Sequence, residues 1–487
     1  MLGMIRTAFL QYFFISFVYC LSDHPILIVV SYDAFRYNFF DTHHLPLTEQ
    51  LRKHGTYADY LINVFPTKTF PNHHSIATGL YPEKHGVVGN SFWDQKQNKL
   101  INVSYELYHY NEEIVPIWRY NEDMGRGRYS ASMMWPGAIY SYQNKNITYA
   151  QHFNMSMDWY ERIDKVISWI KNPDKPANLI MVYFEEPDTH GHAFGPNSDV
   201  VENLLVKLDK ITQYLEDQLQ IHSLKSKVNV VHLSDHGLVP VLASNILNIT
   251  QYLEPGTYER AGTSPLMDII PKDGYEGQIY KNLKAAAEEN ENFDVYKKSE
   301  FLDRWHYKNN PRSPPILVMA KVGFALEDIT ENIPFYTSTY NISVTDNWEF
   351  GVHGYDYIVS DMNPFFMARG PKIKANHKVP TFHTVDLFNL FCRILELPTV
   401  NNDGSLSIID GILLTEDSST YTFSSVLLIT VGGVLLALIL ISCAALVTLL
   451  MIKRQQNITT TAALNKRFPQ TFTHTIEAQH LLDPEEA

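Results

Sequence analysis

Cysteine is scarce in this sequence, with three residues among 487. Cys20 lies just after an apolar run near the N-terminus, Cys443 lies within a second apolar run near the C-terminus, and Cys392 stands alone between the two runs. An intramolecular disulfide framework is therefore excluded, and stability has to come from a large core rather than from covalent cross-links. We interpret Cys392 as a buried apolar side chain, with an intermolecular disulfide as the alternative.

Positive charge is also scarce. The sequence contains 39 lysine and arginine residues but 53 acidic residues, which gives a formal net charge of -14. A surface that binds nucleic acid requires a basic stripe, so this balance argues against nucleic acid as a partner. Small anionic substrates are compatible with it if metal ions supply the local positive charge. The sequence has no internal repeat and no low-complexity linker, and its composition is that of a globular protein.

The first apolar run, residues 8–18, follows an N-terminus that carries Arg6. The small or polar residues Cys20 and Ser22 come shortly after it. This is the layout of a cleavable signal peptide, and the run is too short to span a bilayer comfortably. We therefore assign residues 1–22 to a signal peptide, with a buried N-terminal core helix as the alternative.

The second apolar run, residues 425–452, contains no charged residue. It is long enough to cross a hydrocarbon core of about 30 Å, and we predict a transmembrane helix there. Lys453 and Arg454 follow directly, so the positive-inside rule places the tail, residues 453–487, in the cytosol. The sequence thus predicts a single-pass type I protein of the plasma membrane with an extracellular catalytic domain.

Asn-X-Ser/Thr sequons, the acceptor sites for N-linked glycans, are spread over the region that this topology exposes. They lie at Asn102, Asn146, Asn154, Asn248 and Asn341. A sixth sequon, at Asn457, would lie in the cytosol and stay unmodified.

The tail contains a segment that ends in Leu481 and Leu482, preceded by Glu477. This pattern fits an acidic dileucine sorting signal. It predicts a sorting adaptor as a partner and cycling between the cell surface and endosomes. A disordered amphipathic tail is the alternative.

Three continuous apolar runs are typical of buried parallel strands. They are residues 26–31, 179–184 and 228–233. Apolar residues at three- and four-residue spacing predict helices between them, at residues 159–170 and 200–215. Strand and helix alternate, so the sequence predicts an α/β fold.

We predict that the catalytic domain covers residues 23–400 and that a juxtamembrane stalk, residues 401–424, joins it to the membrane helix. The stretch from Asp235 to Gly351 is poorer in strand signals and rich in Pro and Asn. We expect peripheral hairpins and helices there.

Carboxylate and imidazole side chains follow the predicted strands or stand beside glycine. The candidates are Asp33, Asp188, His192, Asp235, His236 and His353. In open α/β sheets a ligand binds beyond the carboxyl ends of the strands, and oxygen and nitrogen ligands without thiolate suit zinc in a hydrolytic site. Singly, Asp33 is also explained as a turn residue, and His236 as a helix cap or as a buried histidine whose hydrogen bonds are satisfied in the core. Together, with glycines that let the backbone bend around an ion, they predict metal binding.

A nucleophile is available in the segment Phe65–Gly79, where Thr69 precedes an amphipathic stretch that has the pattern of a helix start. A hydroxyl at a helix N-terminus beside a zinc ion loses its proton more easily and faces a phosphate group that the helix dipole favours. The alternative for Thr69 is an ordinary N-cap, where threonine is common.

Short segments throughout the central region then carry a resemblance. They are Tyr32–Arg36, Lys68–His73, Gly79–Gly86, Gly89–Asn90, Trp135–Gly137, Glu185–His192, Ser234–Gly237 and His353–Tyr355. In this order they resemble the nucleotide pyrophosphatase/phosphodiesterases, within the alkaline phosphatase superfamily. One catalytic domain followed by a membrane helix is most similar to the fourth and fifth members. The resemblance implies a mixed or parallel central sheet flanked by helices.

The resemblance also implies two Zn²⁺ ions as cofactors and a role for each ligand. One zinc would be held by Asp33, Thr69, Asp235 and His236, and the other by Asp188, His192 and His353. Thr69 would attack phosphorus to form a covalent intermediate. Two metals about 4 Å apart stabilise both the attacking oxygen and the charge that develops on the phosphoryl oxygens.

Three further positions align with the family's substrate contacts. Asn90 would donate a hydrogen bond to a phosphate oxygen, with a turn residue as the alternative. Phe70 and Phe153 would stack on a nucleobase. For Phe153 a core position is the alternative, and Tyr149 or Trp159 would serve as well.

Two departures from the family bear on substrate preference. The family usually has disulfides in this region, and close relatives carry aspartate after the Trp-Pro-Gly motif, where this chain has Ala138. The favoured function is hydrolysis of extracellular dinucleoside polyphosphates such as diadenosine triphosphate, nucleoside triphosphates or NAD-like dinucleotides to a nucleoside 5′-monophosphate. The alternatives are a phosphodiesterase for choline-type lysophospholipids or glycerophosphodiesters, and a catalytically silent cell-surface recognition protein.

Overall fold

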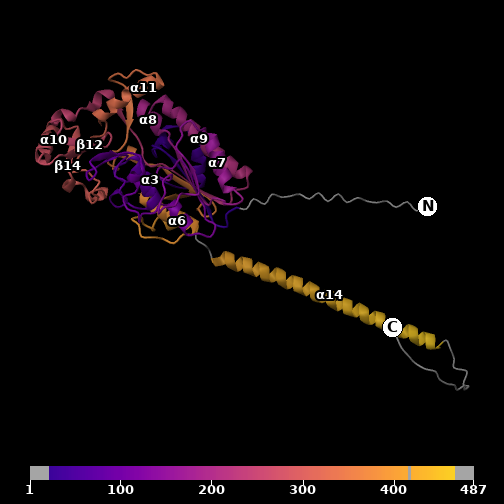
Figure 1. Ribbon diagram of the computed structural model, residues 1–487. Coiled ribbons are helices and arrows are strands. Elements are labelled where there is room, and N and C mark those ends of the chain that lie inside the picture. The colour runs from indigo at the N-terminus through magenta and orange to yellow at the C-terminus, as the bar shows by residue number, and fades with distance from the viewer. Residues whose placement is uncertain (1–20, 415–417, 467–487) are drawn as a thin grey trace, which may run out of the picture. The chain divides into compact units, whose positions relative to one another are not determined.

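The computed structural model describes residues 21–414 and 418–466 (Figure 1). The chain divides into two compact units between Leu414 and Thr415. The predictions of a signal peptide and of a sorting signal at Leu481 and Leu482 concern residues outside the described ranges, apart from the last two residues of the signal peptide.

The first unit is built on an eight-stranded sheet with the order β19-β2-β18-β9-β1-β8-β6-β7. The three predicted strands are its centre: β1 (Ile26–Tyr32), β8 (Leu179–Phe184) and β9 (Val228–Leu233). β8 and β9 both pair with β1 in parallel, and every residue of the three strands is buried. Burial on both faces explains why these strands are continuously apolar.

The outer strands make the sheet mixed, as expected. β6 (Ser130–Met133) and β7 (Tyr149–Gln151) continue the parallel order beyond β8. On the other side β18 (Phe366–Arg369) runs antiparallel to β9 and to β2 (Thr56–Ala58), and β19 (His377–Val379) pairs with β2. The predicted α/β class with a mostly parallel central sheet is confirmed.

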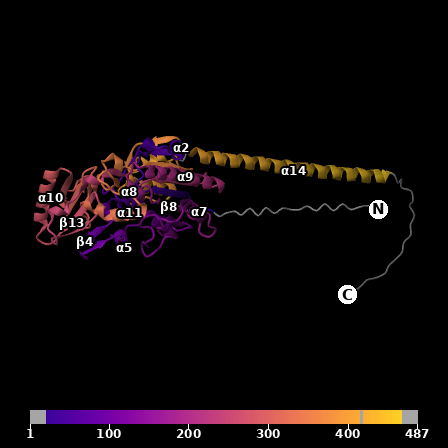
Figure 2. The same ribbon diagram turned by 90° about the horizontal axis from the view of Figure 1, so that it is seen from above.

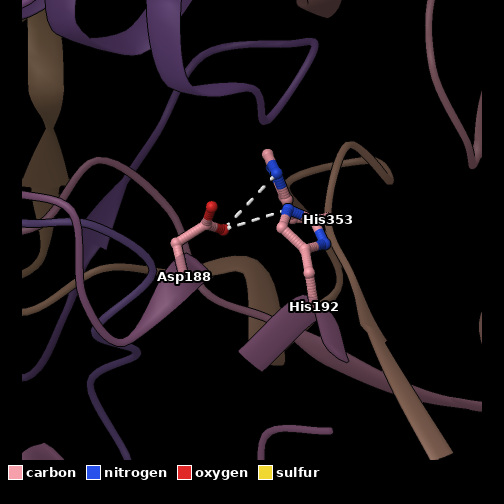
Figure 3. Close-up of side chains that lie close together, drawn as sticks. All are labelled: Asp188, His192 and His353. Carbon is pink, nitrogen blue, oxygen red and sulfur yellow. Dashed lines mark ion pairs between the residues drawn. The ribbon is translucent and has the colours of Figure 1, made fainter. Parts of the chain in front are cut away.

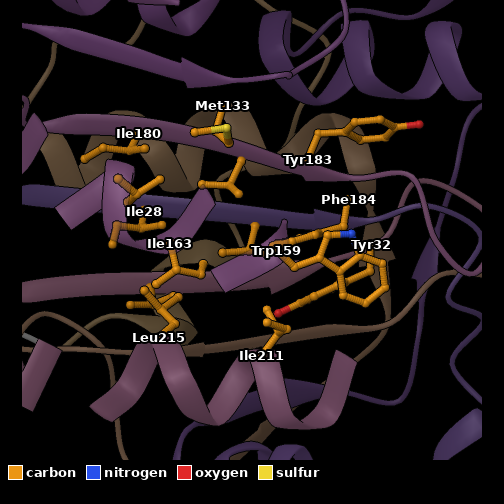
Figure 4. Close-up of a cluster of buried hydrophobic side chains, with 14 of the residues drawn as sticks. Ile28, Tyr32, Met133, Trp159, Ile163, Ile180, Tyr183, Phe184, Ile211 and Leu215 are labelled. Carbon is orange, nitrogen blue, oxygen red and sulfur yellow. The ribbon is translucent and has the colours of Figure 1, made fainter. Parts of the chain in front are cut away.

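Helices cover both faces of this sheet. Residues that alternate along β1 point to opposite sides: Ile28 packs with α7 (Trp159–Ile170) and α9 (Asp199–Ile221), as Figure 4 shows. Val29 packs on the other side, with α3 (Thr69–Thr78) and α12 (Leu387–Leu395). Cys392 in α12 is buried in this second core, as predicted for an apolar side chain.

The stretch from Asp235 to Gly351 contains more regular structure than the sequence predicted. A four-stranded antiparallel sheet joins β12 (Tyr258–Ala261), β13 (Leu266–Pro271), β15 (Ile316–Ala320) and β14 (Phe293–Lys297). Helix α10 (Glu276–Asn290) packs on it around Leu283 (Figure 1 and Figure 2). This sheet has a core of its own, so it is more than the peripheral hairpins that we expected.

The end of the first unit lies beyond the predicted boundary at residue 400. Helix α13 (Ile409–Ile412) buries both of its terminal isoleucines in the same core as α12. Residues 401–414 therefore belong to the compact unit, because two apolar side chains anchor them.

The second unit contains helix α14 (Ser418–Lys466), which is longer than the predicted membrane span. Within the described residues it is the one helix that is long and apolar enough to cross a membrane, over Thr430–Asn457, with a mean hydropathy of 2.9.

Candidate active site

One group of metal-ligating side chains lies at the carboxyl ends of β1 and β9. Asp33 follows β1, and Asp235 and His236 follow β9 closely; all three are buried. The Nε2 atom of His236 lies 3.3 Å from Oδ1 of Asp33 and 3.2 Å from Oδ2 of Asp235. One ligand atom from each residue lies within 4.8 Å of the others, the spacing that a metal ion requires.

A second group comes from α8 (Asp188–Phe194) and from the end of β17 (Glu349–Val352). Figure 3 shows His192 and His353 facing the same carboxylate oxygen of Asp188, Oδ1. Their Nε2 atoms lie 3.3 and 3.6 Å from it. The rings of His353 and His236 stack with centroids 3.7 Å apart, so the two groups are direct neighbours.

Backbone carbonyl groups orient all three histidines in the same way. The Nδ1 atoms of His236, His192 and His353 lie 2.9, 2.8 and 2.9 Å from the carbonyl oxygens of Gly237, Gly351 and Thr67. A proton on Nδ1 is therefore donated to the backbone, and the lone pair of Nε2 is left for a cation, as is usual around metals. Tyr183 likewise donates a hydrogen bond of 2.5 Å to Oδ2 of Asp33.

One oxygen of each carboxylate in the two groups has no hydrogen-bond partner. Within the described part of the chain, Oδ1 of Asp33, Oδ1 of Asp188 and Oδ2 of Asp235 are buried and accept no hydrogen bond. Burial, and then the charges of Asp235 and Asp188, raise the pKa of Asp33 well above its usual range. Gathering carboxylates that each have an oxygen without a hydrogen bond, away from water, is unfavourable unless cations neutralise them. The donor set therefore fits two divalent metal ions.

Thr69 is the first residue of α3 and is only 6% exposed. Its Oγ1 lies 3.3 Å from Nε2 of His236, beside the first ligand group. The N-cap of α3 is Lys68, so the hydroxyl of Thr69 does not have the ordinary capping role that was its alternative. It stands where the helix dipole favours an anion.

Lys68 is a residue of the site that the sequence analysis did not single out. Its buried Nζ donates hydrogen bonds of 2.7 Å to the carbonyl oxygens of Ser264 and His353. Burial lowers its pKa to about 8. The sequence offered a reason to consider Lys68, because it directly precedes the predicted nucleophile Thr69. It ties the start of α3 to the loop of a metal-ligand candidate.

Two cavities border the two ligand groups. A cavity of about 200 Å³ with a mixed lining includes the polar residues Lys68, Asn90, His192, Asp328 and His353. An apolar cavity of about 280 Å³ is lined by Phe70, Val103, Tyr108, Met134, Trp135, Pro136, Gly137, Ile139, Tyr140, Phe153 and Tyr183. Tyr183, which the sequence analysis also missed, connects the second cavity to Asp33 through its hydroxyl.

The predicted substrate contacts fall on these cavities. Oδ1 of Asn90 accepts a hydrogen bond of 3.0 Å from the backbone N–H of Phe70, so its amide group is what it can offer to a ligand. Phe153 is 55% exposed at the apolar cavity, with its ring 6.3 Å from that of Tyr183, so the core alternative for Phe153 is wrong.

The other two aromatic candidates are engaged elsewhere. Trp159 is buried and donates a hydrogen bond to Glu185, and Tyr149 stacks on Trp169. Neither lines the apolar cavity. Of the four aromatic residues that the sequence offered for base stacking, Phe70 and Phe153 line the apolar cavity.

The comparisons with known proteins agree with this architecture. The family model described as "Type I phosphodiesterase / nucleotide pyrophosphatase" matches residues 27–356. The human ectonucleotide pyrophosphatase/phosphodiesterase family member 5 is 32% identical over 415 residues, which cover 83% of this chain and 82% of that protein. The human bis(5′-adenosyl)-triphosphatase ENPP4 is 32% identical over 384 residues, covering 78% and 80%.

Solved structures give the same result. Murine ectonucleotide pyrophosphatase/phosphodiesterase 5, as a threonine-to-alanine variant described as inactive and in complex with AMP, superposes with a TM-score of 0.72 at 31% identity. The match covers 80% of this chain and all of that one. The fold and the paired ligand groups define a metallo-phosphodiesterase of the alkaline phosphatase superfamily. The chain belongs to the type I phosphodiesterase/nucleotide pyrophosphatase family.

Proposed function

We propose that this protein is a zinc-dependent ectoenzyme that hydrolyses phosphoanhydride or phosphodiester bonds of extracellular nucleotides and releases a nucleoside 5′-monophosphate. The observation that carries the proposal is the placement of Thr69, at a helix N-terminus and 3.3 Å from a histidine of one ligand group, with the second group stacked against it.

Zinc is the cation that the donors favour. Each group combines carboxylate oxygens with imidazole Nε2 and contains no thiolate, the ligand set of hydrolytic zinc sites. Asp33, Asp235, His236 and Thr69 would hold one ion, and Asp188, His192 and His353 the other. Two zinc ions bound there would stabilise the attacking oxygen and the negative charge on the transferred phosphoryl group.

In this proposal each residue of the site has a separate role in the reaction. Oγ1 of Thr69 attacks phosphorus, the bond to the leaving oxygen breaks, and a phosphothreonine ester forms. The amide of Asn90 donates a hydrogen bond to a phosphoryl oxygen. Water then cleaves the ester, which restores the hydroxyl of Thr69 and releases the monophosphate.

The apolar cavity supports a nucleotide as substrate. Phe70 follows the nucleophile directly and Phe153 lies at the open side of the cavity, so a heteroaromatic base has flat surfaces to stack on. Two relatives point the same way, since one is named a bis(5′-adenosyl)-triphosphatase and another was solved with AMP. We extend this substrate class to dinucleoside polyphosphates, nucleoside triphosphates and NAD-like dinucleotides.

The test is turnover by the purified chain with zinc and a panel of diadenosine triphosphate, ATP, NAD and glycerophosphocholine. Monophosphate release that disappears in a Thr69→Ala variant supports the proposal and ranks the substrates. Choline-type products alone would favour the lipid phosphodiesterase instead. Absence of turnover in a zinc-loaded protein would favour a surface recognition protein.

We also propose that α14 anchors the catalytic unit outside the plasma membrane, with a cytosolic tail that carries the sorting signal. Biotinylation of intact cells tests the topology, because the lysines of the first unit should be labelled. Surface abundance and uptake that do not change when Leu481 and Leu482 are replaced by alanine would reject the sorting signal.

A further inference from the structure

Two of the glycosylation sequons stand at the rim of the apolar cavity. Asn102 directly precedes Val103, and Asn154 directly follows Phe153. Both neighbours line the cavity and are more than half exposed, Val103 at 57% and Phe153 at 55%. A cavity-lining residue with that exposure lies at the opening, so each sequon asparagine is one residue, about 3.8 Å between Cα atoms, from the rim.

The two asparagines are available for modification. Both are exposed, and they come from separate segments: Asn102 lies between β5 (Lys99–Ile101) and α5 (Tyr105–Tyr108), and Asn154 lies between β7 and α7. Each sequon ends in serine. Neither asparagine belongs to the ligand groups or lines the cavity itself.

We infer that N-linked glycans on Asn102 and Asn154 form a glycan fence that restricts the apolar cavity to small nucleotides and keeps polymeric phosphodiesters out. The inference rests on the proposed function, because it concerns what that site admits. A glycan is bulky and hydrated, and two of them at one opening occupy the space through which a polymer has to run on leaving the cavity. A mononucleotide unit needs only the cavity of about 280 Å³.

The sequon at Asn248 provides a matched control in the same chain. Asn248 is exposed and lies in an open groove lined by residues that include Thr250 and Glu327. This groove shares no lining residue with the apolar cavity. A glycan on Asn248 therefore adds the same mass and hydration to the protein without bordering the site.

The first part of the test is occupancy. The full chain, produced in a secretory cell, is treated with peptide N-glycosidase in heavy-oxygen water, and the labelled aspartates are mapped by mass spectrometry. The inference requires label at both Asn102 and Asn154. An unmodified asparagine at either position overturns the two-glycan fence.

The second part is a ratio of rates, for a single-stranded oligodeoxynucleotide against diadenosine triphosphate. Asn102→Gln with Asn154→Gln should raise this ratio about tenfold, because a steric screen acts on association. Asn248→Gln should leave it unchanged. Ser104→Ala with Ser156→Ala removes the same glycans while keeping the asparagines, and endoglycosidase trimming of the folded protein shortens each glycan to one sugar without any substitution.

Agreement among the three ways of removing the glycans supports the inference. A ratio that stays unchanged while diadenosine triphosphate turns over normally overturns the inference and leaves the proposed function intact. If the chain without substitutions, with its glycans in place, shows no Thr69-dependent turnover of diadenosine triphosphate, and the glycan-free variants show none of either substrate, the proposed function is overturned, and the inference with it.

Discussion

The candidate metal centre and the apolar cavity are neighbours built in different ways. The candidate ligands follow β1 and β9, lie in α8 or follow β17, and those after β1 and β9 are almost completely buried. The cavity is lined mostly by residues of loops and short elements, apart from Phe70 of α3 and Tyr183 of β8, and Phe153 on its rim is half exposed. We infer from the comparison that the sheet positions the residues proposed for the reaction, whereas the loops would select which molecules reach them.

The largest effect should come from the nucleophile. Thr69→Ala should lower kcat by about a thousandfold or more, since no other hydroxyl takes over the covalent step. Steady-state release of AMP from diadenosine triphosphate measures it. Thr69→Ser keeps the hydroxyl and is the control, with partial activity expected. An alanine variant that retains more than a tenth of the activity would exclude the covalent mechanism.

Metal removal should be next, because it affects both activity and stability. Chelation should abolish turnover and lower Tm, since metal at 100 times its Kd stabilises a fold by about 2.7 kcal/mol. Without metal, the buried oxygens of Asp33, Asp188 and Asp235 are left unneutralised. Thermal unfolding with a chelator, then with zinc restored, measures the effect. A Tm independent of zinc contradicts a buried metal centre.

Tyr183 joins the two regions, because it donates a hydrogen bond to Asp33 and lines the apolar cavity. Tyr183→Phe keeps the ring and removes the donor. We expect a loss of about 10- to 100-fold in zinc affinity, the usual effect of losing a partner of a metal ligand. Competition with a zinc chelator gives the affinity. If only KM for the nucleotide changes, Tyr183 belongs to the cavity alone.

The smallest effect should come from the rim. Phe153→Ala should raise KM about tenfold with little change in kcat, because stacking on a base contributes about 1–3 kcal/mol. Tm should stay nearly constant, since the side chain is 55% exposed. Phe153→Tyr preserves the stacking surface and should behave as the unmodified chain. A large fall in kcat would mean that the rim and the centre are not separable.

The same contrast explains how far the sequence predicted the molecule. β1, β8 and β9 were predictable because a buried parallel strand is continuously apolar, and the ligand candidates at Asp33 and Asp235 follow such strands. Helix α7 was predictable from its amphipathic spacing.

The rest depends on contacts between distant segments. The four-stranded antiparallel sheet escaped notice because its strands pair across long stretches of sequence, as β13 does with β15, and are separated by loops rich in Pro and Asn. Lys68 and Tyr183 were missed because their roles come from partners far along the chain, at Ser264 and Asp33. The sequence did not indicate that residues 401–414 belong to the first compact unit, because that follows only from the packing of α13 in the core.

The most direct test of the account is a crystal structure of the Thr69→Ala variant with zinc and AMP, using anomalous scattering at the zinc edge. The account predicts two zinc peaks, one among Asp33, Asp235 and His236 and one among Asp188, His192 and His353. It places the base of AMP between Phe70 and Phe153. One peak or none at these groups, or a base bound outside the apolar cavity, would contradict it.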